Sequence, residues 1–254
     1  MTDHEGFSWL KTELGRSAQR HNPVSDNLDK ARKRLATVVR PLADEQAKYL
    51  QRLKREGEEL GRRQDFVWFS LLSSMATMGN VRGYLGLICT HENYEKVSFD
   101  ALSKQPSPKE RLRVLKQTLR EAKVRLPNKK ANWLATNFET ILEMGGLSAA
   151  KKNLFKTEGK QCKIKFLDAF IGISDKYARN IMMDIYHPEF RDSIAVDERI
   201  RGISQELGLS FSDYASHEDF YLSLAHEIGL EGWELDKLLF KFADDIVCSL
   251  RLST

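Results

Sequence analysis

The segment "KFLDAFIGISDKYARNIMMDIY", residues 165–186, contains two helical stretches joined by a very short turn with glycine. The second stretch has one apolar face, formed by Tyr177, Ala178, Ile181, Met182 and Ile185. In such a pair, the amides of the turn and the N-terminus of the second helix point outward together. That helix end carries about half a positive charge and unpaired N–H groups, which suits a phosphate. The alternative interpretation is an ordinary corner between helices.

Helical periodicity covers most of the remaining chain, and neither a strand alternation nor a tight hairpin turn is convincing. The sequence therefore predicts an all-α protein of about ten helices. One helix is expected to start after Pro41, and a buried one to end near Gly79. Another should carry a Ser216/Asp219 cap, and residues 231–252 should form a single final helix.

The composition is that of a folded globular protein. Of the 254 residues, 41% are hydrophobic and 30% are charged, and no apolar run reaches the roughly 20 residues that a bilayer requires. The acidic, mixed start has no hydrophobic signal core, so an intracellular location is expected. Residues 1–22 are interpreted as a loosely attached extension, and residues 23–254 as the folded domain.

The net charge bears on the kind of binding partner, and the cysteines and histidines bear on whether a metal site is present. A net charge of +4 permits an anionic partner without requiring one. Cys89, Cys162 and Cys248 lie far apart in the sequence, which excludes a paired-cysteine metal motif and favours three reduced, structural thiols. The six histidines have no metal-ligand spacing, so no metal site is predicted.

Lys176 and Asp197 are the candidate catalytic residues. Lys176 lies near a helix N-terminus, where the dipole and partial burial both favour the neutral amine that Schiff-base chemistry needs. Asp197 precedes the helical stretch "ERIRGISQELG" and is suited to cap it. A capping aspartate is also a rigidly held carboxylate, aimed at a developing positive charge. The capping and catalytic interpretations are therefore compatible.

These segments resemble the helix-hairpin-helix glycosylase superfamily, which includes endonuclease III and 8-oxoguanine DNA glycosylase. The family pattern Leu-Pro-Gly-Val-Gly-x-Lys-x-Ala is matched at Gly172, Ile173, Lys176 and Ala178. "IAVDERIR", residues 194–201, matches the later aspartate motif through Asp197. "LLSSMATMGNV", residues 71–81, resembles a further segment and places Met75 and Thr77 at its glutamine and threonine positions.

The departures from the family pattern concern mainly the turn. Ile171 replaces the proline, Ser174 replaces the second glycine, and Asp175 puts a carboxylate near the expected phosphate site. Met75 replaces a polar residue that is often inserted at the lesion, and an apolar wedge is physically acceptable. No cysteine cluster follows the aspartate motif, so the iron–sulfur cluster of endonuclease III relatives is not expected.

The resemblance implies a DNA glycosylase with lyase activity, in which Lys176 attacks the sugar of a flipped nucleotide and Asp197 stabilises the cationic intermediate. It implies two helical subdomains that flank a cleft: a central one over about residues 75–190, and one built from the N- and C-terminal helices. Double-stranded DNA with a damaged base or an abasic site is the expected partner. One active site per chain makes a monomer sufficient, and no cofactor is required. The expected DNA contacts are Gly172, Ile173, Ser174, Met75 and Thr77.

The expected substrate is an oxidised base. Residues 66–91 contain no Asp or Glu, and Leu71 stands where adenine-removing members carry an acidic residue. The resemblance therefore favours 8-oxoguanine, followed by oxidised pyrimidines. The aromatic candidates for stacking on the base, each of which alternatively packs in the core, are Trp68, Phe69, Trp233 and Phe240. Two other functions remain open, a non-catalytic DNA-binding protein and a monofunctional glycosylase for alkylated bases.

Overall fold

The computed structural model describes residues 23–78 and 81–252, and all regular elements within these ranges are helices. This confirms the all-α prediction, although the number of helices exceeds the expected ten because several are short. The predicted extension over residues 1–22 lies outside the described residues. None of the described helices is both long and apolar enough to cross a membrane.

The helices follow one another along the chain with short connections. The first eight are α1 (Pro23–Glu45), α2 (Ala47–Arg62), α3 (Phe66–Thr77), α4 (Val81–Leu87), α5 (His91–Lys96), α6 (Phe99–Ser103), α7 (Pro108–Glu121) and α8 (Pro127–Glu143). The others are α9 (Leu147–Lys156), α10 (Lys160–Asp168), α11 (Asp175–Asp184), the 3-10 helix η1 (Pro188–Phe190), α12 (Glu198–Glu206), α13 (Tyr214–Ile228), α14 (Gly232–Lys241) and α15 (Ala243–Leu252).

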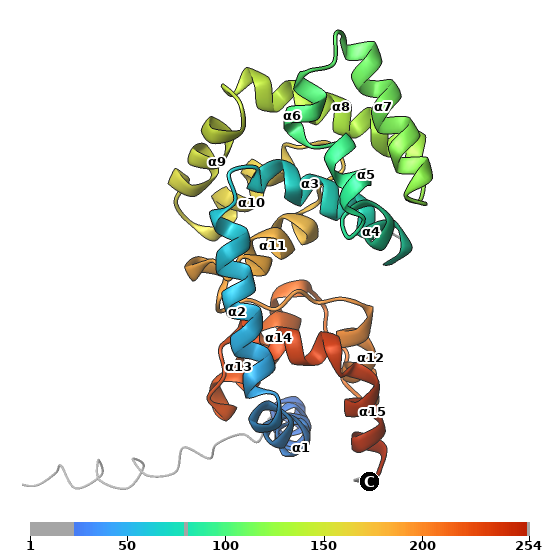
Figure 1. Ribbon diagram of the computed structural model, residues 1–254. Coiled ribbons are helices and arrows are strands. Elements are labelled where there is room, and N and C mark those ends of the chain that lie inside the picture. Colours follow the sequence, from blue (N-terminus) through green and yellow to red (C-terminus); the bar gives the residue numbers. More distant parts are fainter. Residues whose placement is uncertain (1–22, 79–80, 253–254) are drawn as a thin grey trace, which may run out of the picture.

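The helices form two groups, and α2 runs from one to the other (Figure 1). Helices α3 to α11 make up the first group. The second contains α12 to α15 together with α1, which packs against α13 and α15. The second group is therefore assembled from segments that are far apart in the sequence.

Helix α1 continues through Pro41, where the sequence predicted the start of a new helix. Proline in a helix interior removes a hydrogen bond and costs about 3 kcal/mol. Leu35, Val39 and Ala43 are nevertheless all buried, so one apolar face continues past the proline. Burial of this face offsets the cost, and the helix ends only at Glu45.

Two other predicted boundaries were wrong. The N-cap of α13 is Asp213, whose side chain accepts the N–H of Ser216 at 2.8 Å, so the Ser216/Asp219 pattern does not start the helix. The expected final helix is divided at Phe242, which ends α14 and packs edge-to-face against Tyr49. The predicted end at Gly79 lies outside the described residues, and α3 is assigned only to Thr77.

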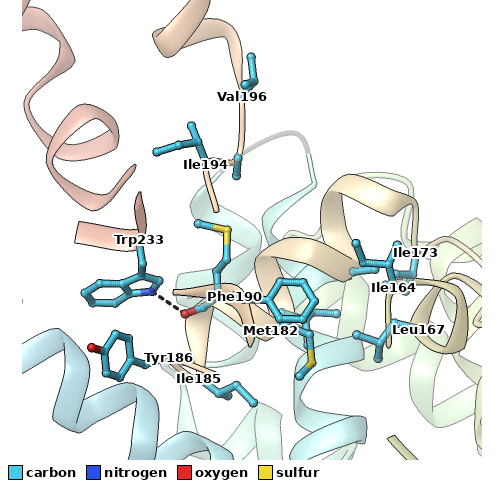
Figure 2. Packing of buried hydrophobic residues seen from close by; sticks show 14 of the residues in the cluster. Ile164, Leu167, Ile173, Met182, Ile185, Tyr186, Phe190, Ile194, Val196 and Trp233 are labelled. Atoms are coloured by element: carbon cyan, nitrogen blue, oxygen red, sulfur yellow. Dashed lines mark hydrogen bonds between the residues drawn. The ribbon is translucent and has the colours of Figure 1, made fainter. Parts of the chain in front are cut away.

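Core residues pack against the turn between α10 and α11 from the inside of the protein. Ile164, Leu167 and Ile173 lie together on the inner side of this turn (Figure 2). On the other side of α11, the indole N–H of Trp233 donates to the Met183 carbonyl at 2.6 Å, shown as a dashed line in Figure 2. This bond fixes α14 against α11 and brings the two groups of helices together.

Candidate active site

The turn between α10 and α11 has the shape that the sequence predicted. Gly172 has a φ of +88°, and a Cβ added there would lie 2.6 Å from the Met75 Cε and 2.7 Å from the Trp133 ring. Glycine is therefore required both by the backbone and by the space. Ile173 is buried, so only its backbone is placed to face a ligand. Ser174 is exposed and makes no side-chain cap, which leaves the first N–H groups of α11 without a capping side chain.

Lys176 is the second residue of α11, and its side chain is exposed. The partial burial expected for it is absent, because the turn places this position outside the core. Tyr177, which follows it, lines a cavity between the two groups of helices. The amine thus lies at the surface, next to a residue of the cavity wall.

Asp197 caps α12, as its sequence context predicted. Its Oδ1 accepts the backbone N–H groups of Arg199 at 3.0 Å and Ile200 at 3.1 Å. Its Oδ2 lies 3.6 Å from the guanidinium of Arg199, and its side chain is only 17% exposed. These contacts hold the carboxylate in one orientation.

Glu218 of α13 connects the helix of Lys176 to the segment that leads to Asp197. Its Oε1 accepts the Arg179 guanidinium at 3.0 Å and the backbone N–H of Ile194 at 2.9 Å. Arg179 lies one turn after Lys176, on the same face of α11. The two candidate catalytic residues are therefore positioned by elements that one partly buried ion pair holds together.

A second carboxylate, this one buried, supports the same segment from α14. Asp236 Oδ1 accepts the backbone N–H of Ala195 at 2.8 Å. Burial raises the pKa of Asp236 to about 6, although Lys237 and the Ala195 N–H both act to lower it. The segment before Asp197 is thus fixed on two sides, and the side chains of Ile194 and Val196 within it are buried.

A cavity of about 530 Å³ lies between the two groups of helices. Its walls come mainly from α2, α3, α11 and α14, and its aromatic lining residues are Tyr49, Phe69, Tyr84, Tyr177, Trp233 and Phe240. Three of the four aromatic residues predicted to stack on a base therefore line it. The guanidinium of Arg199 lies 4.1 Å from the Phe240 ring centroid, which connects Asp197 to this wall through Arg199.

The cavity also contains an ion pair that the sequence did not reveal. Lys237 Nζ lies 3.1 Å from Asp184 Oδ1. Burial acts to lower the pKa of Lys237, but the carboxylates of Asp184 and Asp236 outweigh it and raise that pKa above its ordinary value. The ammonium group is therefore charged, and it faces the cavity together with its partner.

Trp68 does not line the cavity. It is fully buried, its indole N–H donates to the Val97 carbonyl at 2.8 Å, and its ring packs edge-to-face against Phe99 and Phe138. Phe69, the next residue of α3, is turned by about 100° around the helix and does line the cavity. Its assignment to a base pocket was wrong, and Trp68 is a core residue.

Met75 is fully buried as well, so its side chain cannot reach DNA as the sequence suggested. Its Cε instead lies beneath the turn at Gly172, where it supports the hairpin. Thr77 does line the cavity, but its hydroxyl donates to the carbonyls of Ser73 and Ser74 within its own helix. Met75 is therefore a supporting residue of the turn.

An exposed apolar residue lies at the start of α8. Leu126 is 55% exposed and has a φ of +56°, a backbone conformation that is rare for leucine. One turn later, Lys130 donates to the carbonyls of Met75 at 2.7 Å and Met78 at 2.9 Å. Leu126 thus lies near the C-terminal end of α3, where the sequence placed a wedge. In the sequence, the dipeptide Leu126-Pro127 did not indicate a wedge residue.

Within the described ranges, no cluster of three or more His, Cys, Asp or Glu side chains is arranged to hold a metal ion. The three cysteines are free and exposed, whereas the sequence favoured structural thiols. Their positions on the surface explain the difference, because none of them contributes to the core.

No protein-family model matches this chain, and no curated protein matches it either. Its three-dimensional structure is nevertheless similar to solved structures. It matches the 8-oxoguanine DNA glycosylase of Thermotoga maritima with a TM-score of 0.59 at 17% sequence identity, over 84% of this chain and 95% of that one. It matches the Methanocaldococcus jannaschii 8-oxoguanine glycosylase/lyase in complex with 8-oxoguanine DNA equally well, with a TM-score of 0.59 at 16% identity over 82% and 95% of the two chains.

A second structure of the M. jannaschii enzyme gives a TM-score of 0.55 at 16% identity, over 88% of this chain and 96% of that one. At these identities the likeness concerns the fold. It extends over nearly the full length of each solved structure, so it includes both groups of helices. The chain therefore has the fold of the 8-oxoguanine DNA glycosylases, as the resemblance of its hairpin and aspartate segments predicted.

Proposed function

We propose that this protein is a DNA glycosylase that removes a damaged base and then cleaves the strand through a lysine Schiff base. The observation that carries the proposal is the joint placement of Lys176 and Asp197. Both lie on elements that Glu218 connects. Lys176 is followed by Tyr177, which lines the cavity, and Asp197 is linked to the lining residue Phe240 through Arg199. The fold match supports the same class of reaction.

The reaction begins with extrusion of the damaged nucleotide from the duplex into the cavity. The neutral amine of Lys176 attacks C1′ of the sugar, a C–N bond forms, and the glycosidic bond breaks. The departing base takes the electron pair of that bond and a proton that the newly bonded amine gives up. Asp197 stabilises the positive charge that develops on the sugar, since its carboxylate is held by two backbone N–H groups.

The second half of the reaction cleaves the strand. Loss of the amine proton and opening of the sugar ring give an imine between Nζ and C1′. Water then takes a proton from C2′, a C2′=C3′ double bond forms, and the C3′–O bond breaks so that the 3′ phosphate leaves with its electron pair by β-elimination. An amine and a carboxylate are the only protein groups that these reaction steps use, so the proposal invokes no metal and no organic cofactor.

The cavity is the proposed site for the flipped base. Phe69, Trp233 and Phe240 provide aromatic surface, and the Lys237–Asp184 pair provides a donor and an acceptor for the edge of the base. We propose 8-oxoguanine as the first substrate to test and oxidised pyrimidines as the second. Leu71 is fully buried and apolar, so it cannot supply the acidic group that adenine removal needs.

The hairpin turn and α11 N-terminus are the proposed contacts to the DNA backbone, through the amides around Gly172, Ile173 and Ser174. Leu126 takes the wedge role in place of Met75, because it is an exposed apolar residue at the start of α8, whose Lys130 contacts the end of α3. The two groups of helices correspond in this proposal to the two subdomains of an intracellular enzyme. It acts as a monomer on double-stranded DNA.

Borohydride trapping tests the mechanism. The protein is incubated with duplexes that contain 8-oxoguanine, thymine glycol, uracil or an abasic site, and borohydride is added. A covalent adduct is expected with the wild-type chain and none with Lys176→Gln. Lys165→Gln is the matched control, because Lys165 is also an exposed lysine of the hairpin but lies on α10. It should form the adduct at the wild-type rate.

Two other outcomes would contradict the proposal in distinct ways. Base release without a trapped adduct would indicate a monofunctional glycosylase, in which Lys176 is incidental. Binding to the duplexes with neither base release nor an adduct would indicate a DNA-binding protein without catalysis.

A further inference from the structure

The carboxamide of Asn137 binds both backbone polar groups of Ile171, in the turn of the hairpin. Its Oδ1 accepts the Ile171 N–H at 2.8 Å, and its Nδ2 donates to the Ile171 carbonyl at 3.0 Å. Asn137 belongs to α8 and is only 1% exposed. A side chain of a different helix therefore completes the hydrogen bonding of this residue.

Two neighbours of Asn137 on α8 contact the same region. Trp133 packs against Gly172, and Lys130 donates to the carbonyls of Met75 and Met78. The spacing of residues 130, 133 and 137 places them on one face of the helix. This face of α8 supports the turn of the hairpin and the end of α3 together.

Ile171 needs such a partner because of its chemistry. At this position the pattern that the hairpin resembles has proline, which has no N–H and a fixed φ. Isoleucine has an N–H that must be satisfied and a backbone that is freer to move. The Ile171 side chain is exposed, but its N–H and carbonyl face the buried Asn137 carboxamide. Leaving one polar group of such a buried pair unpaired costs about 1–3 kcal/mol. The Asn137 carboxamide removes this cost and fixes the turn at the same time.

We propose that Asn137 is a positioning residue for DNA binding, which holds the turn at Ile171 in the shape that presents the amides after Gly172 to a phosphate. It takes the place of the missing proline. This inference rests on the proposed function, since it assumes that the hairpin grips the DNA backbone. Asn137 itself does not touch DNA, because it is buried beneath the turn.

The test compares Asn137→Leu with the double variant Asn137→Leu/Ile171→Pro. Leucine keeps the volume but removes both hydrogen-bonding groups. Binding to a duplex with a tetrahydrofuran abasic site is measured over a range of salt concentrations. Asn137→Leu should weaken binding about tenfold, which corresponds to about 1.4 kcal/mol. It should also flatten the dependence of affinity on salt, because fewer phosphate contacts form.

Proline at position 171 should restore most of the lost affinity and salt dependence, because it removes the unpaired N–H and fixes the turn. Ile141→Val is the matched control, since Ile141 is also fully buried on α8 but forms no side-chain hydrogen bond to the turn. It should cost about 0.5–1.5 kcal/mol of stability and leave the salt dependence unchanged. A merely structural role of Asn137 would instead make the two single variants behave alike.

Hydrogen exchange gives a second measurement that needs no substitution. In the wild-type protein the Ile171 amide should exchange slowly, although it lies in a turn. Fast exchange there would overturn the inference, as would unchanged binding by a folded Asn137→Leu variant. Wild-type protein that does not bind the duplex at all would overturn the proposed function and this inference together.

Discussion

The guanidinium of Arg179 lies 3.0 Å from the carboxylate of Glu218, and the same carboxylate oxygen accepts the N–H of Ile194 at 2.9 Å. Arg179 follows Lys176 by one helical turn, and Ile194 precedes Asp197 by three residues. The side chain of Glu218 is only 14% exposed, so solvent weakens this ion pair little. Glu218 thus fixes Lys176 and Asp197 relative to each other, although it contacts neither of them.

Replacing Glu218 with alanine should slow adduct formation more than it weakens DNA binding. The amine and the carboxylate would lose their fixed relation, and a misplacement of about 1 Å can cost on the order of 100-fold in rate. Single-turnover borohydride trapping measures the rate, and titration with the same duplex measures affinity. Glu198→Ala is the control, because Glu198 is a glutamate 94% exposed on α12. Equal losses of rate and affinity would argue against a positioning role for Glu218.

Leu126→Ala should slow excision from a fully paired duplex, on the order of tenfold, because the wedge offsets part of the cost of flipping a base. The effect should shrink when the damaged base is placed opposite a gap, where little pairing has to be broken. Leu142→Ala serves as the control, since Leu142 is 43% exposed on the same helix. A rate loss that is the same on both substrates would exclude the wedge role.

Gly172→Ala should destabilise the protein and weaken DNA binding. The added methyl group would approach Met75 and Trp133 closely, and a non-glycine residue at a φ of +88° costs about 1–3 kcal/mol. Thermal unfolding measures the first effect. Gly202→Ala provides the comparison, because nothing lies within 4 Å of an added Cβ there. That helical position should gain about 0.5–1 kcal/mol.

Asp236 predicts a specific dependence of stability on pH. Its folded pKa of about 6 lies above the ordinary 3.8, so the folded state binds more protons between these values. The free energy of unfolding should therefore fall as pH rises from about 4 to 6. Asp236→Asn keeps an oxygen to accept the Ala195 N–H and should lack this component. Chemical denaturation of both proteins at several pH values measures the difference, and parallel curves would contradict the assignment.

The sequence predicted the helical class, the hairpin and the cap at Asp197, because each depends on local features. Glycine before a helix start and aspartate before an apolar period have direct conformational consequences. The burial of Trp68 and Met75 was not predictable in this way. On a helix that is apolar nearly all round, periodicity does not indicate which face meets the cavity.

The contacts that arrange the site were also invisible in the sequence. Asn137 and Ile171 are 34 residues apart, and Arg179 and Glu218 are 39 apart. Nothing in the local pattern pairs a single asparagine or glutamate with a partner at such a distance. Pairs of this kind emerge only from the packing of helices, which places the residues of α8 and α13 beside the turn and α11.

The packing of α1 against α13 and α15 has a consequence for the biosynthesis of the protein. Helices α3 to α11 form a continuous stretch and contact mainly near neighbours, so they can collapse while the chain is still emerging from the ribosome. Among the described helices α1 precedes all the others, whereas its main partners, α13 and α15, are among the last of them in the chain. The apolar face of α1 therefore stays exposed until α13 and α15 have been synthesised. During that interval it is a binding site for a chaperone that binds exposed apolar helices.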